Sequence, residues 1–110
     1  MIYEIRTYNC LPGGAQELMQ RVGEVYEHRA KYSEVAGFWY TDIGPLHQVV
    51  HLWPYESMDD RLRVRAEAAK DKNWPPETYD LIADMQSEIF MPTSFCPEMQ
   101  SGELGPVYEM

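Results

Sequence analysis

Residues 37–55 read GFWYTDIGPLHQVVHLWPY, and this stretch decides the fold class. Residues 35–43 and 47–55 are both rich in aromatic and β-branched side chains, which favour strands. Gly44-Pro45 lies between them and supplies turn chemistry. The stretch therefore predicts a β-hairpin, and its aromatic side chains form either core or one wall of a ligand pocket.

The segment before the hairpin predicts a strand followed by a helix. Residues 2–9 alternate in the manner of a half-buried strand. Residues 12–14, Pro-Gly-Gly, then break the chain. Apolar residues from Leu18 onwards recur at helical spacing, which predicts an amphipathic helix that ends near Tyr32.

The segment after the hairpin predicts a second helix and a last strand. Ser57 followed three residues later by Asp60 is typical of a helix start, and the helix should run to about Lys70. Residues 77–84 predict a short further helix that starts on Pro76, because Pro is tolerated in a first turn. Residues 86–91 alternate as a strand and are followed by Pro92.

This order, β-α-β-β-α-β, indicates an α+β fold of the split βαβ type. We expect an antiparallel sheet with strand order 4-1-3-2 and both helices on one face. Two such sheets packed face to face would close a barrel. Residues 1–94 form the predicted domain, and residues 95–110 a C-terminal extension. Because GPVYEM at 105–110 echoes the opening MIYEI, the extension is an extra edge strand or the stub of a second repeat, unless the echo is a chance similarity in a loose acidic tail.

Composition excludes several classes of protein. The chain has 110 residues, 45% of them hydrophobic, which suffices for one domain with a core. Its net charge of −9 makes nucleic acid and anionic lipid poor partners. No apolar run approaches a membrane span, so we expect a cytoplasmic protein. Cys10 and Cys96 show no metal or disulfide pattern and are expected to be reduced.

Three blocks of residues resemble one family at the proper spacing. They are YEIRTYNCLPG at 3–13, GFWYTDIGPLHQVVHLWPYES at 37–57 and RLRVRAEAAKDKNW at 61–74. The chain resembles the NIPSNAP family of dimeric α/β-barrel proteins over residues 2–92. The resemblance implies a ferredoxin-like fold, a face-to-face homodimer and a pocket in each half of the barrel. It implies no reaction, because the wider superfamily includes cofactor-free monooxygenases, ring-modifying enzymes and haem proteins, whereas NIPSNAP members are linked mainly to binding and trafficking.

Strand alternation predicts which side chains line that pocket. If Tyr3 and Ile5 pack on the helices, the alternate residues of the first strand face the barrel interior. Val50 and Leu52 would then face the helices. The candidate ligand-binding residues are Glu4, Arg6, Tyr8, Trp53, Tyr55 and Glu88, with His51 as the candidate catalytic residue.

The charged members of this set admit two interpretations. A buried carboxylate is costly unless a cation pairs with it, so Glu4 or Glu88 should form a network with Arg6 or His51. The network is either structural or also contacts ligand. His51 suits acid–base chemistry because imidazole exchanges protons near neutral pH, although a histidine in such a position is more often structural.

Two other patterns are weighed against simpler roles. His47 and His51 are four residues apart on one strand, roughly 13 Å, which is too far to share a metal ion. No metal or other cofactor is predicted. Arg61 and Arg65 lie one helical turn apart and either clamp an anion or pair with acids such as Asp42 or Glu67.

Two functions follow from these observations, and the sequence leaves open whether the protein is an enzyme. The first is binding of a small apolar or aromatic molecule in the barrel cavity, with cofactor-independent oxygenase or isomerase-type chemistry as its catalytic form. The alternative is a non-catalytic dimeric interaction module whose barrel is filled by its own side chains.

Overall fold

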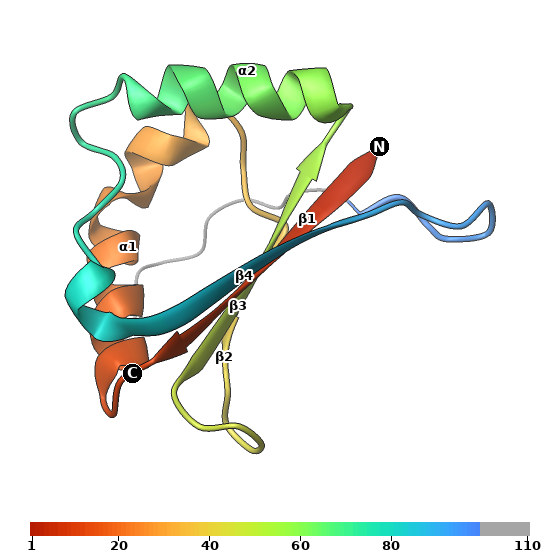
Figure 1. The fold of residues 1–110 in the computed structure, drawn as a ribbon. Coiled ribbons are helices and arrows are strands. Elements are labelled where there is room, and N and C mark those ends of the chain that lie inside the picture. Colours follow the sequence, from red (N-terminus) through yellow and green to blue (C-terminus); the bar gives the residue numbers. More distant parts are fainter. Residues whose placement is uncertain (100–110) are drawn as a thin grey trace.

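The protein folds as a four-stranded antiparallel sheet with two helices (Figure 1). The computed structural model describes residues 1–99. The elements are β1 (Ile2–Cys10), α1 (Gly14–Ala30), β2 (Gly37–Tyr40), β3 (Gln48–Tyr55), α2 (Met58–Ala69), the 3-10 turn η1 (Tyr79–Leu81) and β4 (Ile82–Phe90). This order confirms the predicted α+β, ferredoxin-like βαββαβ arrangement.

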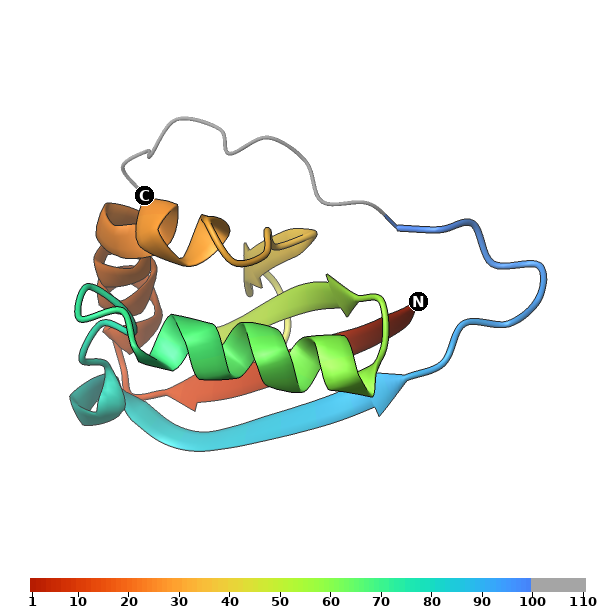
Figure 2. The same cartoon turned by 90° about the horizontal axis from the view of Figure 1, so that it is seen from above.

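The strand order is β2-β3-β1-β4, which is the predicted 4-1-3-2 order read from the other edge. β1 is central and pairs along its length with β3 and β4. Arg6 lies opposite His51 on β3 and opposite Ser87 on β4. Both helices lie on the same side of the sheet, α1 at the left and α2 at the top of Figure 1, and Figure 2 shows α2 running over the strands.

Two buried clusters define the helix-facing side of the sheet. In the first, Ile2, Trp53 and Tyr55 pack with Tyr26 of α1 and Val64 of α2. In the second, Cys10 and Val49 of the sheet pack with Ala15 and Leu18 of α1. The even-numbered residues of β1 and the odd-numbered residues of β3 therefore face the helices, because side chains alternate along a strand.

The predicted assignment of faces was wrong. Tyr3 and Ile5 lie opposite Pro54 and Leu52 on the face that the helices leave open, and Val50 lies on that face too. The alternation itself was read correctly, but the wrong face was given to the core. The reason is the buried carboxylate of Glu4, which arginines from α2 neutralise on the helix-facing side.

The hairpin and both helices form where the sequence predicts them. β2 and β3 are joined by residues 41–47, a longer loop than the predicted turn at Gly44-Pro45. The backbone N–H of Gly13 donates to His47 Nδ1 (3.3 Å), so this histidine holds the hairpin loop against the start of α1. Ser57 Oγ accepts from the N–H of Asp60 (3.1 Å), which confirms the predicted cap of α2.

The crossover from α2 to β4 differs from the prediction. Only the 3-10 turn Tyr79–Leu81 forms in place of the helix expected over residues 77–84. β4 begins at Ile82, four residues earlier than expected, because Ile82 pairs with Cys10 at the far end of β1. Strand pairing along the whole of β1 outweighs the helical tendency of a short segment.

The end of the chain is described up to Met99, whose N–H donates to the Tyr3 hydroxyl (3.0 Å). The echo of the opening sequence at residues 105–110 lies outside the described residues, and the domain boundary after residue 94 stays a prediction. Within residues 1–99 no helix is both long and apolar enough to cross a membrane.

Candidate functional site

The carboxylate of Glu4 is the centre of a polar cluster between β1, β4 and α2. Its side chain is completely buried. Arg61 of α2 donates two hydrogen bonds to it, from Nε to Oε1 (3.0 Å) and from Nη2 to Oε2 (3.1 Å). Arg6 Nη1 (3.0 Å) and Ser87 Oγ (2.5 Å) both donate to Oε2. A charge that would be costly to bury alone is thus fully paired.

This pairing changes the acidity of Glu4. Burial by itself raises the pKa of the carboxyl, but the hydrogen bonds from Arg61, Ser87 and Arg6 outweigh burial and lower the pKa from 4.5 to about 2. Glu4 is therefore ionised at neutral pH. It cannot act as a general acid there, and its acceptor positions are occupied by the protein's own donors.

A second buried cation lies beside this cluster. Arg29 of α1 donates to the Tyr55 hydroxyl (3.0 Å) and to the carbonyl and hydroxyl oxygens of Ser33 (3.0 and 2.9 Å). Its guanidinium carbon lies 4.4 Å from the centre of the Trp53 ring. Neutral oxygens and an aromatic face hold this charge. Burial lowers the pKa of Arg29, but an arginine stays charged near neutral pH.

His51 is buried among aromatic rings on the same face. Its ring stacks on Phe38 at 4.5 Å between centres and meets the edge of Tyr8 at 4.8 Å. Trp53 Nε1 donates to His51 Nδ1 (2.6 Å). Among the described residues, His51 Nε2 has no hydrogen-bond partner although it is buried.

These contacts determine the protonation of His51. Burial, with a smaller effect from the charge of Arg6, lowers its pKa from 6.5 to about 3, against the opposing influence of Glu4. The imidazole is therefore neutral at pH 7. Because Nδ1 accepts a hydrogen bond, the single ring proton is assigned to Nε2. In this state His51 is a hydrogen-bond donor and a poor proton acceptor.

Six of the seven predicted site residues lie together, but on the face opposite to the one expected. Glu4, Arg6, Tyr8, His51, Trp53 and Tyr55 all point to the helices. Glu88 does not belong with them. It pairs with Ile5 on the open face and is exposed, because the register of β4 puts Ser87 on the helix-facing side.

The members that sequence reasoning missed come mainly from the helices. Arg61 was expected to pair with Asp42 or Glu67, or to clamp an anion, and it pairs with Glu4 instead. Arg65 approaches Glu4 at 3.9 Å. The signal available in the sequence was Arg61 and Arg65 flanking Val64, a buried helix position.

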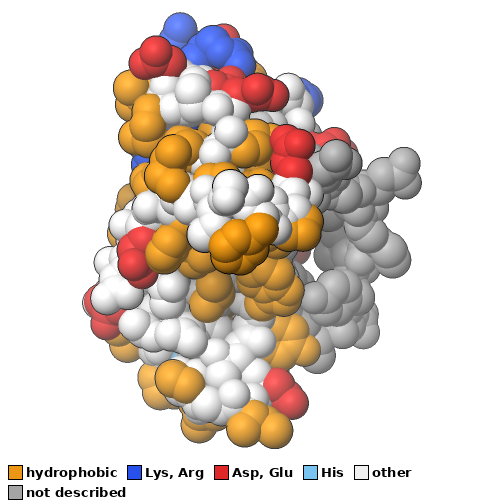
Figure 3. All heavy atoms as spheres, turned by 90° about the vertical axis from the view of Figure 1, so that its right-hand side faces the viewer, with side chains coloured by type: hydrophobic (Ala, Val, Ile, Leu, Met, Phe, Trp, Pro, Cys, Tyr) orange, Lys and Arg blue, Asp and Glu red, His pale blue; other side chains and the backbone are white. Residues whose placement is uncertain are grey.

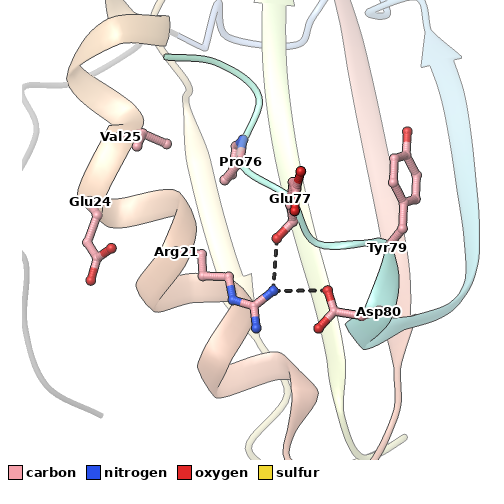
Figure 4. Close-up of a pocket in the computed structure, with 7 residues that line it drawn as sticks. All are labelled: Arg21, Glu24, Val25, Pro76, Glu77, Tyr79 and Asp80. Carbon is pink, nitrogen blue, oxygen red and sulfur yellow. Dashed lines mark hydrogen bonds and ion pairs between the residues drawn. The ribbon is translucent and has the colours of Figure 1, made fainter. Parts of the chain in front are cut away.

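Other features of the described chain are less suited to a site. A groove of about 850 Å³ lies between α1 and the segment before β4 (Figure 4). Its Arg21 already donates to the Glu77 carbonyl and the Asp80 carboxylate, as Figure 4 shows. Burial raises the pKa of Cys10, which makes that thiol a poor nucleophile. Within residues 1–99 no group of three or more metal-binding side chains comes together.

The Glu4 cluster makes a prediction for acid stability. A folded-state pKa that is lower than the unfolded value stabilises the protein above the unfolded pKa, and this contribution is lost as the pH falls from about 5 towards 2. Lowering a pKa from 4.5 to about 2 corresponds to about 3 kcal/mol. We expect Glu4→Gln to lose about this much at pH 7, as measured by urea unfolding, and to show a weaker pH dependence.

The exposed Glu24 on α1 offers a matched control, since Glu24→Gln removes the same charge from the surface. Glu4 also raises the pKa of His51, so the difference between the curves of wild type and Glu4→Gln reports Glu4 together with its effect on His51. Parallel curves between pH 5 and 2 would contradict the assignment.

Comparison with known proteins shows which family this sequence and fold resemble. The NIPSNAP family model matches residues 3–97. A NipSnap homologue of Dictyostelium discoideum is 36% identical over 86 residues, which cover 78% of this chain and 39% of the relative. The chain thus spans well under half of that relative's length. An uncharacterised NIPSNAP-like domain protein from Burkholderia xenovorans is 38% identical, with a TM-score of 0.80 over 91% of both chains.

A more distant likeness concerns the fold alone. A protein of Nitrosomonas europaea with the provisional name antibiotic biosynthesis monooxygenase superposes with a TM-score of 0.61 at 12% identity, over 84% of this chain and 98% of its own. The family model matches most of the sequence, and the structure of the Burkholderia xenovorans protein matches most of the fold. The chain belongs to the NIPSNAP family.

Proposed function

We propose that this protein binds a small organic molecule between the sheet and its helices, beside His51 and the Glu4 cluster. The observation that carries the proposal is the Nε2–H of His51, which is buried and has no partner among the described residues. A buried donor left without an acceptor costs about 1–3 kcal/mol. A ligand with an acceptor atom would recover that free energy.

The surroundings of His51 suggest the chemistry of this molecule. Phe38 and Tyr8 supply aromatic surface next to the imidazole. Arg6 lies directly across from His51 on β1 and adds positive charge. An apolar or aromatic body with a carbonyl, hydroxyl or carboxylate oxygen suits these neighbours, since binding sites combine apolar walls with a few fixed polar groups.

The edge at β4 offers a route of access. Met85, Ser87 and Ile89 lie opposite Tyr8, Arg6 and Glu4, so they are on the helix-facing side. All three are nevertheless exposed, which means that the helices leave this part of the sheet uncovered. A molecule could reach Arg6 and Tyr8 over β4 without opening the core between α1 and β3.

Binding is favoured over turnover at this site. Cofactor-independent oxygenase or isomerase-type chemistry requires a group that removes a proton from the substrate. His51 holds its only proton on Nε2 and has a pKa of about 3, so it does not supply that base at neutral pH. The likeness to a protein named as a monooxygenase is one of fold and assigns no reaction. We therefore propose a binding function and assign no reaction.

We further propose that the open face of the sheet packs against the same face of a second copy. Ile5, Thr7 and Val50 are partly exposed there, with Trp39 and Phe90 about half exposed. Figure 3 shows hydrophobic side chains gathered on the side of the molecule away from α1. A sheet of this size with one apolar face needs a cover, and a two-fold dimer buries the same patch on both copies.

The alternative function is a non-catalytic dimeric interaction module. The apolar open face favours it equally, because dimerisation requires no ligand. What separates the two functions is whether a small molecule binds on the helix-facing side.

A fragment screen tests the ligand site. Small aromatic molecules with oxygen acceptors should raise the unfolding temperature in a saturable way, and a ligand at about 100 times its Kd adds about 2.7 kcal/mol. In NMR spectra a binder should shift the indole N–H signal of Trp53 and the Nε2–H signal of His51. The Trp74 indole, in the crossover, should stay in place and serves as the internal control. If no fragment both binds saturably and shifts the Trp53 and His51 signals, the result would favour the interaction module.

Sedimentation velocity tests the dimer. At micromolar concentration we expect a species of twice the 12.9 kDa chain mass. Val50→Glu introduces a charge into the open face and should shift the equilibrium towards monomer by at least about tenfold, because an unpaired charge is costly to bury. Ala66→Glu, on the exposed part of α2, is the control and should remain dimeric. A folded wild-type monomer at this concentration would overturn the model of the assembly.

A further inference from the structure

Positive charge is concentrated between the helices and the sheet of this acidic protein. The chain has nine Lys and Arg residues and a net charge of −9. Three of its arginines lie at the single carboxylate of Glu4, namely Arg6, Arg61 and Arg65, and Arg29 is buried on the same side of the sheet against Tyr55 and Trp53. Burial raises the pKa of Tyr55, and the charges of Arg29, Glu4, Arg65 and Arg61 act on the same hydroxyl. The cluster therefore has an excess of cations.

Arg65 forms only a long ion pair with Glu4 and no hydrogen bond to it. The hydrogen bonds from Arg61, Arg6 and Ser87 already occupy both of its oxygens. Arg65 Nη1 lies 3.9 Å from Oε1, beyond hydrogen-bond distance, and among residues 1–99 its guanidinium has no hydrogen-bonded acceptor. Its side chain is 44% exposed. Arg65 thus presents a planar set of donors at the border of the cluster.

Exposed apolar side chains lie on the same flank of α2 as Arg65 and on the helix-facing side of β4. On α2, Met58 and Leu62 share a flank with Arg65 by helical spacing, and both are about half exposed. On the helix-facing side of β4, Met85 and Ile89 are exposed as well. Exposed apolar side chains on α2 and β4, together with one available cation on α2, are the arrangement expected for an amphiphilic ligand.

We propose that the ligand is a small organic carboxylate, whose carboxylate is bound by Arg65 and whose apolar body extends from α2 over β4 towards Tyr8 and His51. A guanidinium matches a planar carboxylate with two parallel hydrogen bonds. The surplus positive charge of the cluster attracts the anionic ligand, whereas the rest of this acidic protein repels it. This inference rests on the proposed binding function and names the class of ligand.

Matched probes test the class of ligand. 2-Naphthoate and its neutral isostere 2-naphthamide share an apolar body and differ in charge, and inorganic phosphate offers charge without the body. We expect 2-naphthoate to bind the wild-type protein at least about tenfold more tightly than 2-naphthamide by calorimetry, because hydrogen bonds to charged groups are the stronger kind. Phosphate at a concentration similar to that of 2-naphthoate should not displace 2-naphthoate from the protein.

Matched variants test the role of Arg65. Arg65→Gln should weaken 2-naphthoate about tenfold and leave 2-naphthamide unchanged, and retained 2-naphthamide binding also shows that the variant is folded. Arg63→Gln removes the same charge two residues away, where Arg63 pairs with Asp60 and Glu67, and should change 2-naphthoate affinity by less than about twofold.

Three results would overturn the carboxylate assignment while leaving the proposed binding function standing. They are equal affinity for 2-naphthoate and 2-naphthamide, equal effects of Arg65→Gln and Arg63→Gln, and competition by phosphate at the concentration of 2-naphthoate. If neither probe nor any other small molecule binds, the proposed function itself fails.

Discussion

The buried carboxylate of Glu4 is the constraint on which the arrangement of this protein depends. It lies on the central strand, carries a full charge at neutral pH and has no contact with solvent. Such a group is tolerated only where several donors converge on it, and here they come from α2, from β4 and from β1 itself. The cluster fixes α2 over β1 and decides that the even-numbered side of β1 is the covered side.

The covered face of β1 determines which residues of the neighbouring strand β3 face the helices. Opposite residues in antiparallel strands share a face, so His51, which lies opposite Arg6, is on the helix-facing side. Trp53 and Tyr55 are on the same side because side chains alternate along β3. Trp53 then reaches both His51, through its indole N–H, and Arg29, through its ring. The space between the sheet and the helices thus contains a saturated carboxylate and a neutral histidine from the strands, and a buried arginine from α1. The proposed ligand site depends on these three features.

The sequence was sufficient for the element order, the strand order and the cap at Ser57, because these depend on local periodicity and turn chemistry. It was insufficient for the choice of face. On β1 both alternations carry apolar or aromatic residues, Ile2, Tyr8 and Cys10 on one side and Tyr3 and Ile5 on the other. The prediction placed Tyr3 and Ile5 against the helices, and nothing within β1 itself tests that choice. The arginine that reverses this conclusion is 57 residues away, at Arg61, and periodicity carries no information on such a pair. The six site residues were still correctly grouped, because alternation puts them on one face whichever face is covered. The prediction for Glu88 depended on the register of β4 and was wrong.

A double-mutant cycle between Glu4 and Arg61 tests the central claim most directly. Glu4→Gln, Arg61→Gln and the double variant would be compared with wild type by urea unfolding at pH 7 and one protein concentration. If the pair fixes α2 to β1, the effects are strongly non-additive, with a coupling of about 1.5–3 kcal/mol. Effects that add to within about 0.5 kcal/mol would contradict the claim, since they would show that α2 is held on the sheet without this carboxylate.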